Sequence, residues 1–151
     1  MMSRRVQGGA MVVEFAILLP VMVLLAVGIM EYGRAVYQYD TLTKSARSAA
    51  RYLSQHAAGN ATAIDIARNL AVCGQRDCSG QQPLLPGLTV ANVAVCDASN
   101  CAGTHLGQAT GSGSLNLVTV TITGYVFDAI VPAMVPDITF GPIHASMRQG
   151  S

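Results

Sequence analysis

The chain has 151 residues, with nine Lys and Arg against eight Asp and Glu and a formal net charge of +1. This length allows one modest domain, and a charged fraction of 11% with no basic excess argues against a nucleic-acid partner. Hydrophobic residues make up 51% and aromatic residues only 5%, so the apolar content is aliphatic, and the composition excludes a disordered or collagen-like chain.

The apolar residues are concentrated near the N-terminus. Residues 10–30 read AMVVEFAILLPVMVLLAVGIM, with Glu14 as the one charge. This is about the length that crosses the hydrocarbon core of a bilayer, so we expect a transmembrane helix. Arg4 and Arg5 precede it and keep residues 1–9 in the cytoplasm. A cleaved secretory signal is the alternative, but the run exceeds the usual apolar core of a signal peptide and no small-residue cleavage site follows it.

Glu14 is a candidate functional residue, because a carboxylate inside a membrane span is costly. The alternative is that it lies at the headgroup boundary at little cost. A cut after Gly9 would leave a new ammonium on Ala10, one helical turn from Glu14 and on the same face. In a bundle of parallel helices, the ammonium of one subunit could pair with the carboxylate of the next, since a buried charge is tolerated only when paired.

Two sets of residues in this region resemble those of known families. Arg4 and Arg5, then Gly9 and the stretch AMVVEF, resemble the class III signal of type IV pilins and pseudopilins. Residues 14–51 are more specific, because EFA, the Leu-Pro pair, GIMEYGR and ARSAAR occur there in order. Together they resemble the TadE-like minor pilins of the tight-adherence, Flp-type pilus.

This resemblance implies a minor pilin or pseudopilin, a non-enzymatic structural subunit for pilus assembly in adherence and biofilm formation. It implies cleavage by a prepilin peptidase between Gly9 and Ala10, with Glu14 and Phe15 serving processing and assembly. The implied partners are that peptidase, other pilins and minor pilins, the inner-membrane assembly platform with its ATPase, the secretin and membrane lipid. No cofactor is expected. The implied location is the bacterial inner membrane, with the head in the periplasm or, after assembly, in an extracellular pilus.

Two other functions stay open at this point. The first is an uncleaved single-pass membrane protein whose periplasmic head binds a ligand or an envelope protein. The second is a periplasmic enzyme, which is disfavoured because His56, His105 and His144 are scattered. The sequence has no HExxH, G-x-S-x-G or GxxxxGK[ST] motif, so we expect no catalytic site.

After the apolar run the spacing of apolar residues becomes three or four, which predicts an amphipathic stalk helix over residues 31–56. Lys44, Arg47 and Arg51 form a basic stripe along it. This stripe is either a solvated helix face or a contact for lipid headgroups or an acidic subunit.

Residues 57–151 are expected to form a small α+β head. The stretch AAGN breaks the helix, and Thr62 stands three residues before Asp65 in a capping-box-like start of a short helix that ends at Gly74. The fold class predicted is therefore α+β, a long N-terminal transmembrane and stalk helix followed by a small antiparallel-sheet head.

Three segments of the head are expected to be strands. Residues 88–95 form the first, and residues 115–127 form the second, where Val and Ile alternate with Thr. Residues 107–114, GQATGSGS, are expected to form a mobile surface loop between strands. Residues 138–147 follow a proline-rich stretch and are expected to form a short edge strand.

Four cysteines form two C-x4-C pairs, Cys73 with Cys78 and Cys96 with Cys101. In an oxidising periplasm this pattern predicts two disulfides. We expect these local pairs, since each needs only a short loop, although the sequence does not determine connectivity and a crossed pairing stays open. A zinc site of four thiolates is the other alternative. Zinc pairs are more typically C-x2-C, so we expect no metal.

Overall fold

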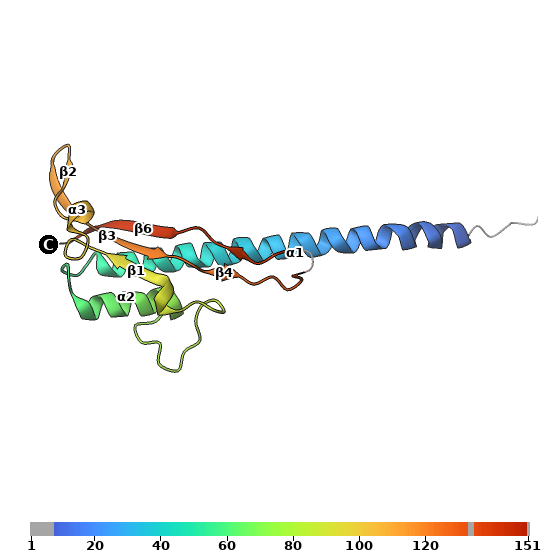
Figure 1. Ribbon diagram of the computed structural model, residues 1–151, viewed down its shortest axis with the longest axis horizontal. Helices are drawn as coiled ribbons and strands as arrows, with labels where there is room; N and C mark the ends of the chain where they lie inside the picture. Colours follow the sequence, from blue (N-terminus) through green and yellow to red (C-terminus); the bar gives the residue numbers. More distant parts are fainter. Residues whose placement is uncertain (1–7, 133–134, 151) are drawn as a thin grey trace, which may run out of the picture.

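The computed structural model describes residues 8–132 and 135–150. One long helix, α1 (Gly8–Leu53), projects from a small head that covers only its C-terminal part (Figure 1). The head contains, in chain order, α2 (Ala61–Cys73), the 3-10 helix η1 (Val90–Asn92), β1 (Val93–Cys96), α3 (Ala102–His105), β2 (Gln108–Thr110), β3 (Gly113–Ile122), β4 (Val126–Phe127), β5 (Ile138–Thr139) and β6 (Ile143–Gln149). This arrangement confirms the predicted fold class.

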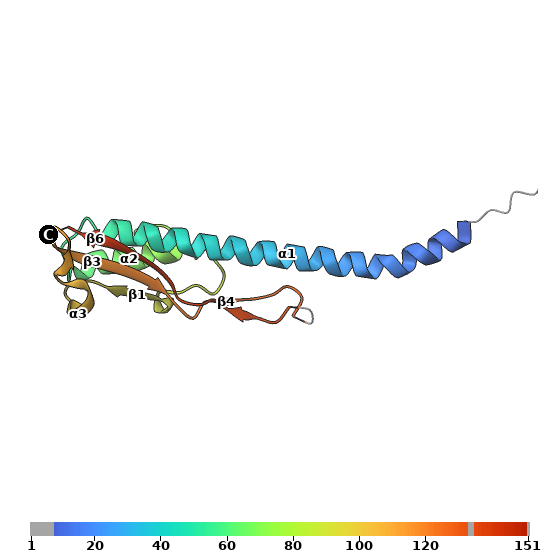
Figure 2. The same ribbon diagram turned by 90° about the horizontal axis from the view of Figure 1, so that it is seen from above.

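Helix α1 runs without interruption through both predicted helical segments. It ends at Leu53, shortly before the expected residue 56, because the amides of Gln55 and His56 bond to carbonyls three residues back rather than four. Pro20 lies inside the helix, and Figure 2 shows a bend in the N-terminal part of α1. A proline removes one backbone donor and is a common cause of such a bend.

The sheet is built around β3. Strand β1 pairs with it antiparallel, with Val93 opposite Ile122, and β6 pairs with it along most of its length. Strand β2 forms a hairpin with the start of β3. The predicted alternation is confirmed, because Val118, Val120 and Ile122 are fully buried while the threonines between them are partly exposed.

The core lies between this sheet, the C-terminal half of α1 and α2. Leu42 and Leu53 of α1 are buried in it with the inward face of β3. Small residues line both helices where they pack, which allows the two backbones to approach closely. These residues are Ala46, Ala49 and Ala50 on α1 and Ala63, Ala67 and Ala71 on α2, each at most 2% exposed.

The start of α2 differs from the prediction. Asn60, not Thr62, is the N-cap, and its Oδ1 accepts a hydrogen bond from the amide of Ala63 at 3.0 Å. The expected capping box therefore does not form, because the helix begins two residues earlier and the asparagine satisfies a free amide there. The predicted C-cap is confirmed, since Gly74 has φ of +73° and donates its amide to Leu70.

The strand boundaries also differ from the prediction. Strand β1 begins at Val93 instead of residue 88, because Asn92 holds the preceding residues in a turn through its bonds to Thr89 and to the carbonyl of Thr123. The strand expected over 115–127 is divided into β3 and β4 by a turn at Gly124, whose φ is +67°.

The prediction of a loop at 107–114 is wrong as well. It contains β2 and the hairpin turn into β3, with Gln108 opposite Leu115 and Thr110 opposite Gly113. The strand expected over 138–147 is divided in two. Strand β5 covers only its first two residues and pairs with β4, while β6 begins at Ile143, pairs with β3 and extends two residues beyond the predicted end.

Candidate assembly and processing site

The N-terminal half of α1 makes almost no contact with the rest of the chain. Residues 11–30 are exposed except for a half-buried Val27, and Phe15, Met22 and Ile29 are each more than 60% exposed. Within Met11–Leu53 the helix is long and apolar enough to cross a membrane. An exposed apolar surface of this size marks a contact with lipid or with another protein, so this segment is a membrane anchor or a signal segment.

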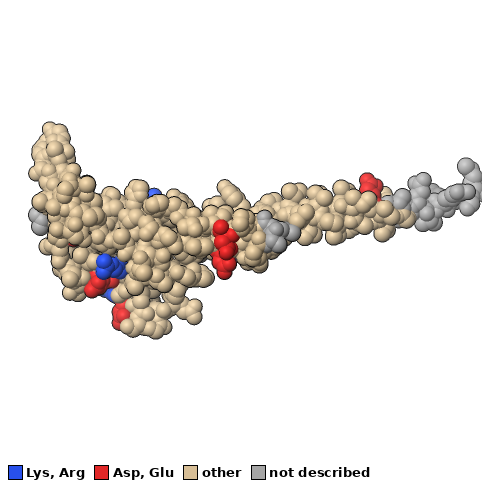
Figure 3. Space-filling model, in the orientation of Figure 1, with Lys and Arg blue, Asp and Glu red and all other residues tan. Residues whose placement is uncertain are grey.

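The predicted site residues lie at the free end of this segment. Because α1 begins at Gly8, the junction between Gly9 and Ala10 lies in its first turn, and Glu14 and Phe15 follow one turn later. Figure 3 shows one acidic patch on the otherwise uncharged projecting surface, which agrees with Glu14 as its one acidic residue in sequence. Glu14 has no hydrogen-bond or ion-pair partner among the residues that the structure describes. Residues 1–7 of the predicted leader lie outside them.

A second polar site holds the head on α1 where the apolar segment ends. Glu31 is only 3% exposed. Its Oε2 lies 2.8 Å from Nη1 of Arg34, and its Oε1 accepts a hydrogen bond from the amide of Ile130 at 3.0 Å. Arg34 also donates to the carbonyl of Asp128. We call this set, Glu31 and Arg34 with the main chain at 128 and 130, the hairpin clamp.

Aromatic residues extend the hairpin clamp along the helix. The Arg34 guanidinium lies over the ring of Phe127 at 5.3 Å. Phe140 contacts Phe127, Tyr125 and Tyr39 with ring centroids about 6 Å apart. The hydroxyl of Tyr125 donates to Gln38 at 2.9 Å, and burial raises the pKa of this hydroxyl, against the opposing charge of Arg34.

A buried carboxylate joins the loops at the other end of the head. Asp97 is 1% exposed and accepts hydrogen bonds from the amides of Gly59, Ser99 and Asn100 and from the Ser99 hydroxyl. Burial alone would raise the pKa of Asp97, but these hydrogen bonds outweigh it and hold the pKa below the ordinary value. Gly59 has φ of +76° and Ser99 lies within 3.2 Å of where a Cβ would stand, so this turn requires glycine.

The four cysteines form the local pairs that we expected. Cys73 bonds to Cys78 with the Cα atoms 5.9 Å apart, and Cys96 bonds to Cys101 with the Cα atoms 5.5 Å apart. All four cysteines lie in disulfides. None of them therefore offers the thiolate that the alternative zinc site requires.

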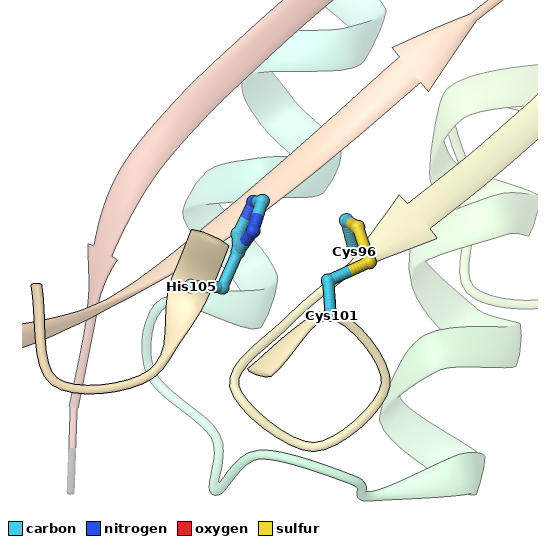
Figure 4. Close-up of side chains that lie close together, drawn as sticks. All are labelled: Cys96, Cys101 and His105. Atoms are coloured by element: carbon cyan, nitrogen blue, oxygen red, sulfur yellow. A yellow bond between two sulfur atoms is a disulfide. The ribbon is translucent and has the colours of Figure 1, made fainter. Parts of the chain in front are cut away.

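The structure also brings His105 next to the second disulfide, as Figure 4 shows. The sulfurs of Cys96 and Cys101 and a ring nitrogen of His105 lie within 4.8 Å of one another. However, one ring nitrogen of His105 hydrogen-bonds Thr104 and the other hydrogen-bonds Thr119, each at 2.8 Å. Disulfide sulfur is a poor metal ligand compared with a thiolate, so this arrangement does not indicate a metal site.

Taken together, these features define a class of protein, one with a single apolar N-terminal helix able to span a membrane and a small disulfide-bonded α+β head. Residues 9–51 match the family model described as TadE-like protein. The N-terminal region of the chain is thus a TadE-like domain, as the sequence resemblance predicts. This family is consistent with a component of the Tad pilus, and its members are generally non-enzymatic. Comparisons with curated proteins and with solved structures give no match.

The match includes Glu14 and both side chains of the hairpin clamp but none of the head beyond α1. From the sequence, Glu31 and Arg34 enter only as part of the GIMEYGR stretch with no contact predicted for them, and Tyr125 and Asp97 are missed altogether. For the clamp a signal existed, since both charges belong to the GIMEYGR stretch that carries the resemblance. For Asp97, a lone acid in a loop, no signal existed.

Proposed function

We propose that this chain is a minor pilin or pseudopilin, a structural subunit for assembly of a Tad-type pilus. Its α1 is inserted in the inner membrane with the N-terminus in the cytoplasm and the head in the periplasm. A prepilin peptidase cuts between Gly9 and Ala10, and the freed helix then packs against the helices of other subunits. Prepilin peptidase, other pilins and the inner-membrane platform are its partners.

The observation that supports this proposal is the bare N-terminal half of α1 with its one carboxylate. A monomeric anchor needs only an apolar surface, and Glu14 makes such a surface worse, since a carboxylate inside a span is costly. Glu14 has no partner in the described chain. After cleavage, the free ammonium on Ala10 of one subunit supplies a partner for the Glu14 carboxylate of its neighbour. This pairing explains the carboxylate without a contact inside one chain.

Cleavage also reverses the sign of the formal net charge of the chain. Removal of Arg4 and Arg5 leaves seven basic residues, from nine less two, against eight acidic ones, so the formal charge changes from +1 to −1. The same step removes the cytoplasmic positive charges that fix the orientation of the span. Cleavage therefore removes the charges that fix the orientation, while the apolar surface of α1 remains for contact with lipid or with the helices of other subunits.

The experiment that tests the proposal is an intact-mass measurement on the full chain, purified from membranes with and without a co-expressed prepilin peptidase. We expect loss of residues 1–9 only with the peptidase, and no loss in the matched variant Gly9→Leu. An uncut chain under both conditions would instead support the uncleaved single-pass anchor with a binding head. A cut beyond residue 30 would show that the helix is a signal peptide.

A further inference from the structure

The hairpin between β4 and β5 ends in an exposed apolar tip. We define the hairpin tip by its described residues, Ile130, Val131, Pro132, Val135 and Pro136. Ile130 is 64% exposed, both prolines are exposed, and none of the five is charged or polar. The amide of Val135 bonds to the carbonyl of Val131 at 3.1 Å, which closes the turn. A single exposed aliphatic residue needs no explanation, but three exposed apolar residues on one hairpin, Ile130, Pro132 and Pro136, with two half-buried valines between them, do.

The hairpin tip lies where the apolar segment of α1 ends. The amide of Ile130 is 3.0 Å from Oε1 of Glu31, and Glu31 directly follows Met30, the last residue of the apolar run. Figures 1 and 2 both show the β4–β5 hairpin lying along α1 with its tip directed toward the N-terminal half of the helix. The tip therefore points toward the membrane and not toward the rest of the head.

The length of the helix sets the level of the bilayer surface. At about 1.5 Å per residue, the 21 residues from 10 to 30 span roughly 31 Å, close to the hydrocarbon thickness of about 30 Å. Glu31 and Ile130 then lie at the boundary between acyl chains and headgroups. Tyr32, at the same level and 72% exposed, is the residue type that is enriched at this boundary.

The distribution of charge agrees with this placement. Glu31, the one acid of α1 at this level, is buried and paired with Arg34 inside the hairpin clamp. The exposed acids Asp128 and Asp137 flank the tip in sequence, and the carbonyl of Asp128 lies at the level of Arg34, one helical turn farther from the span. No Lys or Arg lies in the hairpin, so its attraction to lipid is apolar and not electrostatic.

We propose that the hairpin tip is a second membrane contact, which enters the boundary between headgroups and acyl chains beside the helix and is held at that depth by the hairpin clamp. This inference rests on the membrane insertion of α1 in the proposed function. The partner is the lipid bilayer itself. The hairpin tip continues the apolar surface of the span onto the head. A second copy of the chain covering the tip is the competing occupant.

The absence of Trp from the sequence makes a direct depth measurement possible. Ile130→Trp gives the full chain one tryptophan in the tip, at a side chain that is already exposed. Leu106→Trp is the matched control in the head, 53% exposed, and Leu24→Trp is the control in the middle of the apolar segment, 49% exposed. Each variant is reconstituted in phosphatidylcholine vesicles, with or without acyl chains brominated near the headgroup, and far-ultraviolet circular dichroism verifies its fold.

We expect brominated lipid to quench the tryptophan at position 130 strongly, with blue-shifted emission, and to leave that at position 106 unquenched. Quenching at position 24 with none at position 130 would overturn the proposal while leaving the anchor intact. A blue shift at position 130 without quenching would also overturn it, because protein would then cover the tip. No quenching at either position 24 or position 130 would refute the membrane insertion of α1 together with this inference.

Discussion

The contact between Glu31 and the β4–β5 hairpin gives the sharpest test of how the head is held on the helix. Glu31→Ala removes the acceptor of the Ile130 amide, at 3.0 Å, and the ion-pair partner of Arg34, at 2.8 Å. Glu31 is 3% exposed, so water does not replace it at the amide without entering the contact. We expect the hairpin to open locally from α1 while the core around α2 stays folded.

The size of the effect follows from these two contacts. A hydrogen bond from an amide to a charged acceptor contributes about 1.5–3 kcal/mol. The ion pair adds at most roughly 0.5 kcal/mol, because the Arg34 side chain is 33% exposed and solvent screens it. A loss of about 1.5–3.5 kcal/mol corresponds to local opening that is about 10- to 300-fold more frequent, since each 1.4 kcal/mol is a factor of ten.

Hydrogen exchange measured by mass spectrometry on the full, disulfide-intact chain in detergent reports this opening. Peptides that cover β4 and β5 should exchange faster by the stated factor, and those of α2 should not change. Glu31→Gln keeps an acceptor oxygen for Ile130 and should show a smaller increase. Asp65→Ala breaks only an exposed pair with Arg68 and should leave the hairpin unchanged. Unchanged exchange in β4 and β5 of Glu31→Ala, or an equal rise in α2, would refute a local clamp.

Three further predictions concern the ends of the molecule. Glu14→Gln should insert in membranes at least as well as the parent but fail to assemble, whereas Asp40→Asn on the exposed face should assemble normally; pilus yield and membrane fractionation measure both. Because the pKa of Asp97 is lowered, its hydrogen bonds stabilise the head fully above the ordinary carboxyl pKa of about 3.8 and are lost as the pH falls through the folded pKa. The melting temperature should thus drop below about pH 4, and less steeply in Asp97→Ala; parallel curves would contradict this. Reduction of both disulfides should lower the melting temperature, and an unchanged melt with four free thiols by mass would contradict their structural role.

The sequence predicts α1 well because its signals are local. A long apolar run and a later spacing of three or four residues need no knowledge of distant partners. Leu42, Ala46, Ala49 and Leu53, chosen from that spacing, are all buried. The alternation in β3 is local in the same way, and it correctly identifies the inward face of the sheet.

The same reasoning fails farther toward the N-terminus of α1, because the buried face there is polar. Val36 and Tyr39, which continue the apolar spacing, are about half exposed, while Glu31 and Gln38 are buried. Their partners, Ile130 and Tyr125, stand 99 and 87 residues away in the chain. The spacing of residues within α1 carries no information about partners so distant in sequence. A polar residue of the helix is therefore predicted to face solvent.

The hairpin clamp joins the matched family region on α1 to a hairpin of the head that lies outside the match. Glu31 and Arg34 lie within the TadE-like match, and their hydrogen bonds to the hairpin go to the amide of Ile130 and the carbonyl of Asp128. Every residue offers a carbonyl, and every residue except proline offers an amide, so these two bonds place few demands on the residue types at positions 128 and 130, whereas the contact of Arg34 with Phe127 does require a ring. Changes of the Ile130 side chain should therefore leave the clamp intact, and Ile130→Pro, which removes the donor, should open it as Glu31→Ala does. The clamp fixes the position of the hairpin through the main chain, which leaves the exposed side chains of the tip free for the membrane contact that we propose above.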